Sequence, residues 1–159
     1  MQPCEVDALP AVMIPVGLAA WAIVDPEDSE AVDAIAWALR GSYAASNSKK
    51  RTWMHRFVAS RAGMEIDGLD VDHKNGNGLD NRRCNLRPAT RAQNRQNSNS
   101  HTGRFKGIAF ENGKWVAKIR VGGPVIYLGR FSDEIEAARA YDDAARKHHG
   151  EFARPNFPG

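Results

Sequence analysis

The sequence predicts an α+β fold in which short helices and strands alternate, ending in a three-stranded antiparallel sheet packed on one helix. Three observations predict it. Apolar residues recur with helical spacing after Pro26. Asparagine and glycine, the residues of tight turns, cluster at 75–81 and return at 112–113 and 122–123 between strand-like runs. An alanine-rich segment over 133–149 follows the last of these runs.

The first predicted helix begins at Asp25. An aspartate at the N-cap and Pro26 in the first turn are typical of a helix start. Apolar side chains then recur at i, i+3, i+4 and i+7, namely Val32, Ile35, Ala36 and Leu39. Gly41 follows as the expected stop. The next apolar segment, 53–59, fits a strand or a short helix, and the sequence leaves that choice open.

The middle of the chain predicts a loop followed by a helix. Residues 75–81 read Asn-Gly-Asn-Gly-Leu-Asp-Asn, which favours a loop between two short strands. Thr90, with Gln93 three residues later, fits a capping box, so Asn94 and Asn97 lie in the first turns of that helix. The small, polar stretch 98–103 is typical of a linker.

The C-terminal third predicts the sheet and its helix. The strand-like runs are 105–110, 114–121 and 125–131, and the turns between them contain Asn-Gly and Gly-Gly. Ser132, Asp133 and Glu134 favour a helix start, and Gly150 favours its end near His149. The small alanine side chains allow this helix to lie close to the sheet.

Charge is distributed unevenly along the 159 residues. Residues 1–48 hold seven of the 19 acidic side chains and one of the 22 basic ones, so the remainder is strongly basic and suits a polyanionic partner. Cys4 and Cys84 match no paired spacing, which argues against a disulfide framework or a cysteine-rich zinc site. The apolar run 11–24 contains Pro15 and is too short to span a bilayer. We expect a cytoplasmic, DNA-associated protein that contacts no membrane.

A motif in three parts occupies the middle of the chain. Asp72-His73 is followed by Asn85-Leu86-Arg87 and then by Asn94 and Asn97 behind the threonine cap. With the Leu-Asp-Asn turn at 79–81, this pattern resembles the HNH endonucleases of phages and mobile introns. The resemblance implies a ββα-metal nuclease module, and the segments 14–25 and 54–56 also resemble the leader of such phage proteins.

The HNH resemblance implies a role for each motif residue. Asp72 and Asn94 would hold a divalent metal, Mg²⁺ or Mn²⁺, because hard cations prefer oxygen ligands. His73 would be the general base, and the side-chain oxygen of Asn85 would orient its imidazole. Many relatives carry histidine at the position of Asn94, and Asn97 is an alternative ligand.

The C-terminal tail resembles the AP-two/ERF domain of plant transcription factors. The resemblance rests on runs such as Tyr127-Leu128-Gly129-Arg130-Phe131 and Glu136-Ala137-Ala138-Arg139-Ala140-Tyr141-Asp142. In that family the sheet face enters the major groove of DNA. The residues carried over as DNA contacts are Arg104, Lys106, Lys114, Lys118, Arg120, Tyr127 and Arg130. Ala109 and Val125 stand where the plant domains usually carry arginine, so the plant target sequence is not implied.

The sequence therefore predicts three regions: 1–50 packing on the nuclease, 51–100 as the HNH module, and 101–159 as the AP-two/ERF-like domain. The predicted function is a metal-dependent endonuclease of the homing type that nicks or cleaves double-stranded DNA. The alternative is a non-catalytic, sequence-specific DNA-binding regulator with a degenerate HNH module. One metal site suffices for a monomer to nick one strand, and a dimer stays open as the route to a double-strand cut.

Overall fold

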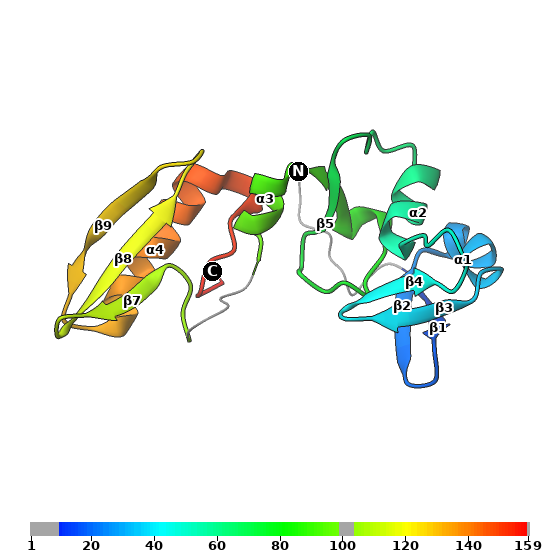
Figure 1. The fold of residues 1–159 in the computed structure, drawn as a ribbon, viewed down its shortest axis with the longest axis horizontal. Helices are drawn as coiled ribbons and strands as arrows, with labels where there is room; N and C mark the ends of the chain where they lie inside the picture. Colours follow the sequence, from blue (N-terminus) through cyan, green and yellow to red (C-terminus); the bar gives the residue numbers. More distant parts are fainter. Residues whose placement is uncertain (1–9, 99–103, 159) are drawn as a thin grey trace. The chain divides into compact units, whose positions relative to one another are not determined.

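The computed structural model describes residues 10–98 and 104–158 and forms two compact units (Figure 1). Unit one is Met1–Thr90 and unit two is Arg91–Gly159. Helices make up 31% and strands 32% of the structure, which confirms the predicted α+β class. Most of the predicted linker, residues 99–103, lies outside the described residues. The predicted divisions at residues 50 and 100 stay predictions.

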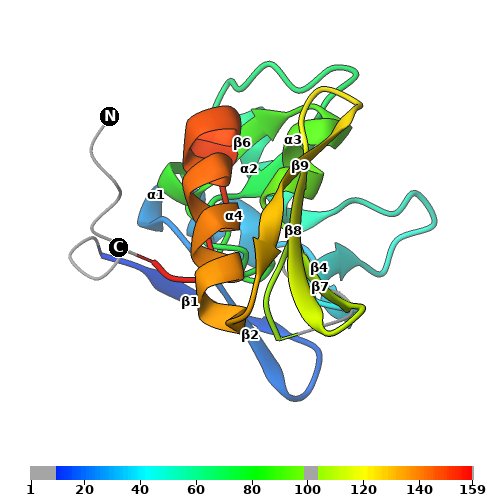
Figure 2. The same ribbon diagram turned by 90° about the vertical axis from the view of Figure 1, so that its left-hand side faces the viewer.

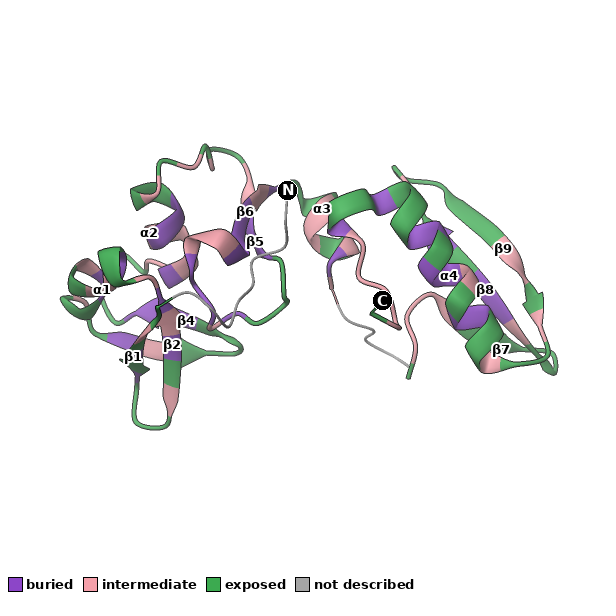
Figure 3. Cartoon of the chain, turned by 180° about the vertical axis from the view of Figure 1, so that it is seen from behind, coloured by how far each residue is buried: buried purple, intermediate pink, exposed green. Residues whose placement is uncertain are grey.

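Unit one begins with two antiparallel hairpins on either side of a helix. The elements are β1 (Val12–Val16), β2 (Ala20–Val24), α1 (Pro26–Asp33), β3 (Trp37–Arg40) and β4 (Tyr43–Ser46). β1 pairs with β2 and β3 with β4. Alternate residues of the first hairpin point inward, so each strand presents one buried apolar face to the core (Figure 3).

The first helix is shorter than the sequence predicts. It ends at Asp33, and the residues expected to continue it to Leu39 instead form a strand in which Leu39 pairs with Ala44. The indole Nε1 of Trp37 donates to the carbonyl of Val32 at 2.7 Å, which satisfies a helix-terminal acceptor. Gly41, with φ 61°, forms the hairpin turn. The helical prediction was wrong here because a left-handed glycine serves a tight turn as well as a helix end.

The rest of unit one places a helix beside a small sheet. α2 (Met54–Arg61) resolves the open choice at 53–59 in favour of a helix. β5 (Asp70–His73) pairs antiparallel with β6 (Leu86–Ala89), and a short 3₁₀ turn, Arg83–Asn85, precedes β6. The loop predicted over 75–81 lies between these two strands. The core gathers apolar side chains from every element, including Ile14, Val24, Val32, Trp37, Met54, Val58 and Leu86.

A buried carboxylate ties the helices of unit one together. Asp28, in α1, is fully buried and accepts from Arg61 Nε at 3.2 Å and from Arg83 Nε at 2.7 Å. Burial raises the pKa of Asp28, but the hydrogen bonds from the two arginines outweigh it and lower the pKa below its usual value. The ionised carboxylate thus links α1 to α2 and to the turn before β6.

Unit two is a three-stranded sheet covered on one face by a helix (Figure 2). Its elements are α3 (Arg91–Gln96), β7 (Ile108–Glu111), β8 (Lys114–Arg120), β9 (Val125–Phe131), α4 (Glu134–His149) and the 3₁₀ turn Gly150–Phe152. The three strands and the helix confirm the predicted sheet. No helix in the described ranges of either unit is long and apolar enough to cross a bilayer.

Local sequence explains how α4 sits on its sheet. The carboxylate of Asp133 accepts from the backbone N–H groups of Ile135 and Glu136 at 2.8 and 2.9 Å, which caps the first turn. Between sheet and helix, Ile119 of β8 packs against Tyr141, Ala144 and Ala145 of α4, and all four side chains are buried. Gly107, with φ 77°, lies against the Tyr141 ring, and a Cβ there would overlap that ring. A glycine is therefore required at the start of the sheet.

Candidate functional site

The imidazole of His73 lies at the end of β5 and is held by an asparagine. His73 is buried, and its Nε2 lies 3.3 Å from Oδ1 of Asn81. The amide nitrogen of Asn81 donates to the carbonyl of Leu79 at 3.2 Å and approaches Sδ of Met54 at 3.3 Å. The carbonyl oxygen of Asn81 therefore faces the ring. It accepts from Nε2–H, which leaves the lone pair of the neutral imidazole on Nδ1.

Two rings pack against His73, and a third stacks on one of them. The ring of His55, in the first turn of α2, lies 5.2 Å from that of His73 at 74°, and the ring of Tyr43 lies 5.7 Å from it. Trp53 stacks on His55 with centroids 6.1 Å apart. The Nδ1 atom of His55 is buried and has no hydrogen-bond partner among the described residues. Sequence reasoning missed these contacts because Tyr43 and His55 are far from the motif.

Burial sets the protonation of both imidazoles. Burial lowers the pKa of His73 below its usual value, although the bond to Asn81 and the carboxylates of Asp72 and Asp80 oppose it. Burial, with the nearby His73, lowers the pKa of His55 to about 3. Both rings are neutral near pH 7, the state in which an imidazole accepts a proton.

Asp72 lies one residue earlier and is paired across the sheet. Its register partner on β6 is Arg87, which donates from Nε at 2.8 Å and approaches from Nη2 at 2.7 Å, both to Oδ2 of the carboxylate. Both side chains are buried. The guanidinium fixes the orientation of the carboxylate and compensates its burial.

Asn85 closes the loop between β5 and β6. Its Oδ1 accepts from the backbone N–H of Asn75 at 3.0 Å, and its Nδ2 donates to the carbonyl of Asp80 at 2.7 Å. The resemblance assigned Asn85 to orienting the imidazole, and the hydrogen bond to the ring comes from Asn81. The Leu-Asp-Asn turn contained Asn81, but nothing in the sequence distinguished it from the other asparagines.

A second buried carboxylate anchors the same loop. Asp80, 1% exposed, accepts from Arg82 Nε and Nη2, both at 2.8 Å, and from Asn75 Nδ2 at 2.9 Å. Burial raises the pKa of Asp80, but the hydrogen bonds, chiefly from Arg82, lower it below its usual value. The loop also pairs with β2, where the Ile23 N–H donates to the Leu79 carbonyl at 2.8 Å. The loop that holds Asn81 is thus rigidly attached to the core.

The two predicted metal ligands belong to different units. Asp72 lies with His73 and Asn85 in unit one, whereas Asn94 lies in α3 of unit two and Asn97 directly follows that helix. Among the described residues, no three His, Cys, Asp or Glu side chains form a metal-binding cluster. The carboxylate of Asp72 is an oxygen ligand of the kind that a hard cation prefers.

The sheet of unit two presents a polar face away from α4. Lys118 is the register partner of Tyr127, and Arg120, two residues further along β8, lies on the same face of the sheet. Lys114 and Arg130 pair with residues of the same face. These side chains are exposed, Tyr127 at 57%. The structure therefore brings five of the seven predicted contact residues onto one sheet face.

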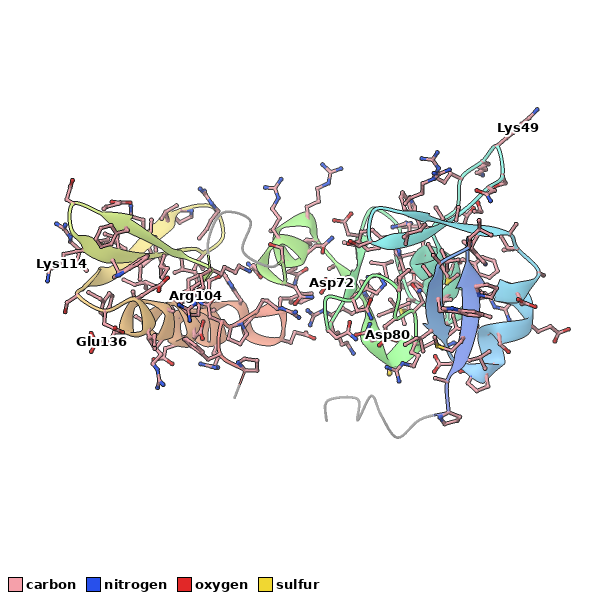
Figure 4. The ribbon with its side chains drawn as sticks, turned by 90° about the horizontal axis from the view of Figure 1, so that it is seen from below. Lys49, Asp72, Asp80, Arg104, Lys114 and Glu136 are labelled. Carbon is pink, nitrogen blue, oxygen red and sulfur yellow. The ribbon has the colours of Figure 1, made fainter. Side chains whose placement is uncertain are left out.

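Short contacts hold several of these cations. Lys118 forms a 2.9 Å ion pair with Glu111, and Arg130 donates to the carbonyl of the same residue at 3.1 Å. Arg120 donates to the carbonyl of Gly123 at 2.6 Å. Arg104 approaches Glu134 at 3.8 Å, outside the strands. Lys114 projects from the sheet (Figure 4).

The ammonium group of Lys106 lies against the end of α3. Its Nζ donates to the carbonyls of Gln96 and Ser98 at 2.5 and 2.6 Å, at the C-terminal end of α3. Burial, with the nearby Arg154, lowers the pKa of Lys106 to about 8. Its ammonium group therefore satisfies carbonyls at the end of α3, within the protein.

Comparison with known proteins matches two different families to two parts of the chain. Residues 52–96 match the family model described as HNH endonuclease. The later part is similar to plant proteins. An AP2/ERF and B3 domain-containing protein of Oryza sativa subsp. japonica is 47% identical over 57 residues, which is 35% of this chain and 16% of the relative. Dehydration-responsive element-binding protein 2C of Arabidopsis thaliana is 54% identical over 48 residues, which is 29% of this chain and 14% of the relative. The chain thus spans a small part of these relatives.

Proposed function

We propose that this chain is a metal-dependent DNA endonuclease of the HNH homing type, which nicks or cleaves double-stranded DNA and is positioned by its AP2/ERF-like sheet. The matches to HNH endonucleases and AP2/ERF proteins support the coarser statement that it is a DNA-binding, nuclease-like protein. The observation that carries the finer proposal is the arrangement of His73, a buried, neutral imidazole held by Asn81 and preceded by the carboxylate of Asp72.

His73 is the proposed general base. Because Nε2–H donates to Asn81, Nδ1 accepts the proton of a water molecule as that water attacks the phosphorus. The new P–O bond forms as the bond to the leaving strand breaks. The rings of Tyr43 and His55 fix the plane of the imidazole by packing against it. Asn85 acts indirectly, because its hydrogen bond to the Asp80 carbonyl closes the loop that contains Asn81.

Asp72 and Asn94 are the proposed metal ligands, with Mg²⁺ or Mn²⁺ as the expected ion. When bound, the ion would stabilise negative charge on the phosphate and on the leaving oxygen. Arg87 already donates to Oδ2 of Asp72, which fixes the orientation of the carboxylate.

In unit two the proposed DNA-contact surface is the face formed by Lys114, Lys118, Arg120, Tyr127 and Arg130. Arg104, which approaches Glu134 of α4, is a further proposed contact. Exposed cations on a sheet face match the negative charge of the DNA backbone. The relative from Arabidopsis thaliana is named as an element-binding protein, which supports DNA as the partner. The proposal needs only a monomer, which would nick one strand.

One observation favours the non-catalytic alternative. The Asp72 carboxylate is paired with Arg87, as it would be in a module that retains the fold without the chemistry. A regulator of this kind would bind DNA through unit two and leave the strands intact.

The test is plasmid nicking. Supercoiled plasmid incubated with the parent chain and Mg²⁺ or Mn²⁺ should become open-circular, and His73→Ala should reduce the rate by about 10²- to 10⁴-fold, the contribution of a general base. DNA binding by His73→Ala should be unchanged in the absence of metal. Intact plasmid with both chains, together with normal binding, would favour the regulator.

A further inference from the structure

We propose that the loop 47–51, between β4 and α2, is a second DNA-backbone site that belongs to the nuclease unit and grips the strand being cut. Its position beside the cut strand rests on the proposed function. Its affinity for phosphates does not, and can be measured without cleavage.

The loop carries a concentrated positive charge. Lys49, Lys50 and Arg51 are consecutive and exposed, and no carboxylate of the described residues forms an ion pair with any of them. Figure 4 shows Lys49 projecting away from the body of unit one. Adjacent like charges repel each other, and a polyanion relieves that repulsion. The chain before the loop is acidic and holds a single basic residue, Arg40, so the loop is the first cluster of cations in the sequence.

The ends of the loop are held together by hydrogen bonds. The Ser46 N–H donates to the Thr52 carbonyl at 2.8 Å, and the Thr52 N–H donates to Oγ of Ser46 at 2.9 Å. Within the loop, Oγ of Ser48 donates to the carbonyl of Lys50 at 2.7 Å. Because its backbone is held in advance, the loop loses less conformational entropy when it binds a strand.

The same loop connects two walls of the His73 site. Tyr43 lies on the strand that enters it and His55 on the helix that leaves it, and both rings pack against His73. Ala45 and Trp53 pair as an isolated bridge between these two walls. Phosphates recur about every 3.4 Å of helix axis along one strand, so a strand bound at His73 would carry several phosphates past the loop that joins these two walls.

The chemistry of the three side chains specifies the ligand. Two ammonium groups act as point charges for phosphate oxygens, and the guanidinium can donate two parallel hydrogen bonds to one phosphate. None of these contacts reads a base, so the loop should bind the DNA backbone irrespective of sequence. Sequence preference would remain a property of unit two.

The experiment compares loop variants in the full chain carrying His73→Ala, without divalent metal, so that no cleavage occurs. Binding to a labelled duplex is followed by fluorescence anisotropy over a range of salt concentrations. The variant Lys49→Ala/Lys50→Ala/Arg51→Ala should lose at least tenfold in affinity at low salt. Its plot of log affinity against log salt should be shallower by about 0.9 for each phosphate contact removed.

Two controls isolate the loop. The charge-conserving variant Lys49→Arg/Lys50→Arg/Arg51→Lys should bind like the parent, and Arg40→Ala, which removes an exposed cation of the same unit, should lose less than twofold. The series is repeated with Lys118→Ala/Arg120→Ala to weaken the sheet face. Unchanged affinity and salt slope in the alanine triple, in both backgrounds, would overturn the proposal. A loss of binding in the alanine triple, together with plasmid that stays intact when the parent chain is tested with Mg²⁺ or Mn²⁺, would uphold the loop and reject the nuclease.

Discussion

In unit one the polar groups of the site are buried and already hydrogen-bonded within the protein, whereas in unit two the residues proposed to bind DNA lie exposed on a sheet face. His73, Asp72, Asp80 and Asn81 are all 5% exposed or less. Tyr127, by contrast, is 57% exposed. Burying polar groups is costly unless each one is paired, so unit one requires a connected network.

This difference separates two physical tasks. A reacting group must be held in one orientation and one protonation state, which burial and fixed partners provide. A backbone-binding surface needs long, solvated cations that adapt to a polyanion, which exposure provides. Substitutions in the two units should therefore fail in different ways.

The largest effect is expected from Asp80→Ala. It leaves the buried guanidinium of Arg82 without its carboxylate and removes a partner of Asn75, so unit one should lose about 3–5 kcal/mol of stability. Nicking should disappear as the loop that holds Asn81 loosens. Amide hydrogen exchange, read separately for peptides of each unit, should show faster exchange in unit one and unchanged exchange in α4.

The matched control is Glu136→Ala, which removes an exposed carboxylate on α4 of unit two. It should change stability by about 0.5 kcal/mol or less. If Asp80→Ala proved as mild as this control, the buried network would not be what supports the site.

A smaller effect, confined to binding, is expected on the sheet face. Arg120→Ala should weaken DNA binding by about 1–3 kcal/mol if the guanidinium reads a base, which is roughly tenfold to a hundredfold in affinity. Titration of a labelled duplex gives the affinity. Amide hydrogen exchange in unit one should not change. Lys147→Ala, an exposed cation on α4, serves as the comparison, and an equal loss with that variant would mean that net charge alone governs binding.

The dependence of stability on pH should also differ between the two units. Burial lowers the pKa of His55 from about 6.5 in the unfolded chain to about 3 in the folded one. Between pH 6.5 and pH 3 the unfolded chain therefore binds a proton on His55 that the folded chain does not. The stability of unit one should thus hold above pH 6.5 and decline as the pH falls from 6.5 towards 3. Hydrogen exchange at a series of pH values, corrected for the intrinsic rate, measures this. His55→Phe, which cannot titrate, should flatten the decline, and an identical decline in both chains would contradict the assignment.

Unit two should respond at the opposite end of the pH range. Burial raises the pKa of Tyr141 to about 12, so the unfolded chain loses this proton first as the pH rises above 10. Its contribution to stability is complete below pH 10 and is lost as the pH rises towards 12. The same exchange series, extended to high pH for the peptides of α4, reveals whether the two units differ in this way.

Regular local patterns in the sequence predicted most of the fold. The turns at 112–113 and 122–123, the cap at Asp133 and the alanines of α4 are short-range signals, and each element formed where its signal lies. The predicted helix to Leu39 failed because Gly41 and the apolar spacing fit two local structures. The choice was made by pairing with β4 and by the Trp37 bond to Val32, which a local pattern does not contain.

The amino-acid sequence by itself determined the α+β class and the three-stranded sheet, because turn and capping signals act over a few neighbours. Only the tertiary structure decided that Asn81 holds His73, that Arg87 pairs with Asp72 and that Lys106 turns towards α3. Each of these contacts joins residues eight or more positions apart. Hydrogen bonds of buried groups are set by which side chains the fold brings within about 3 Å.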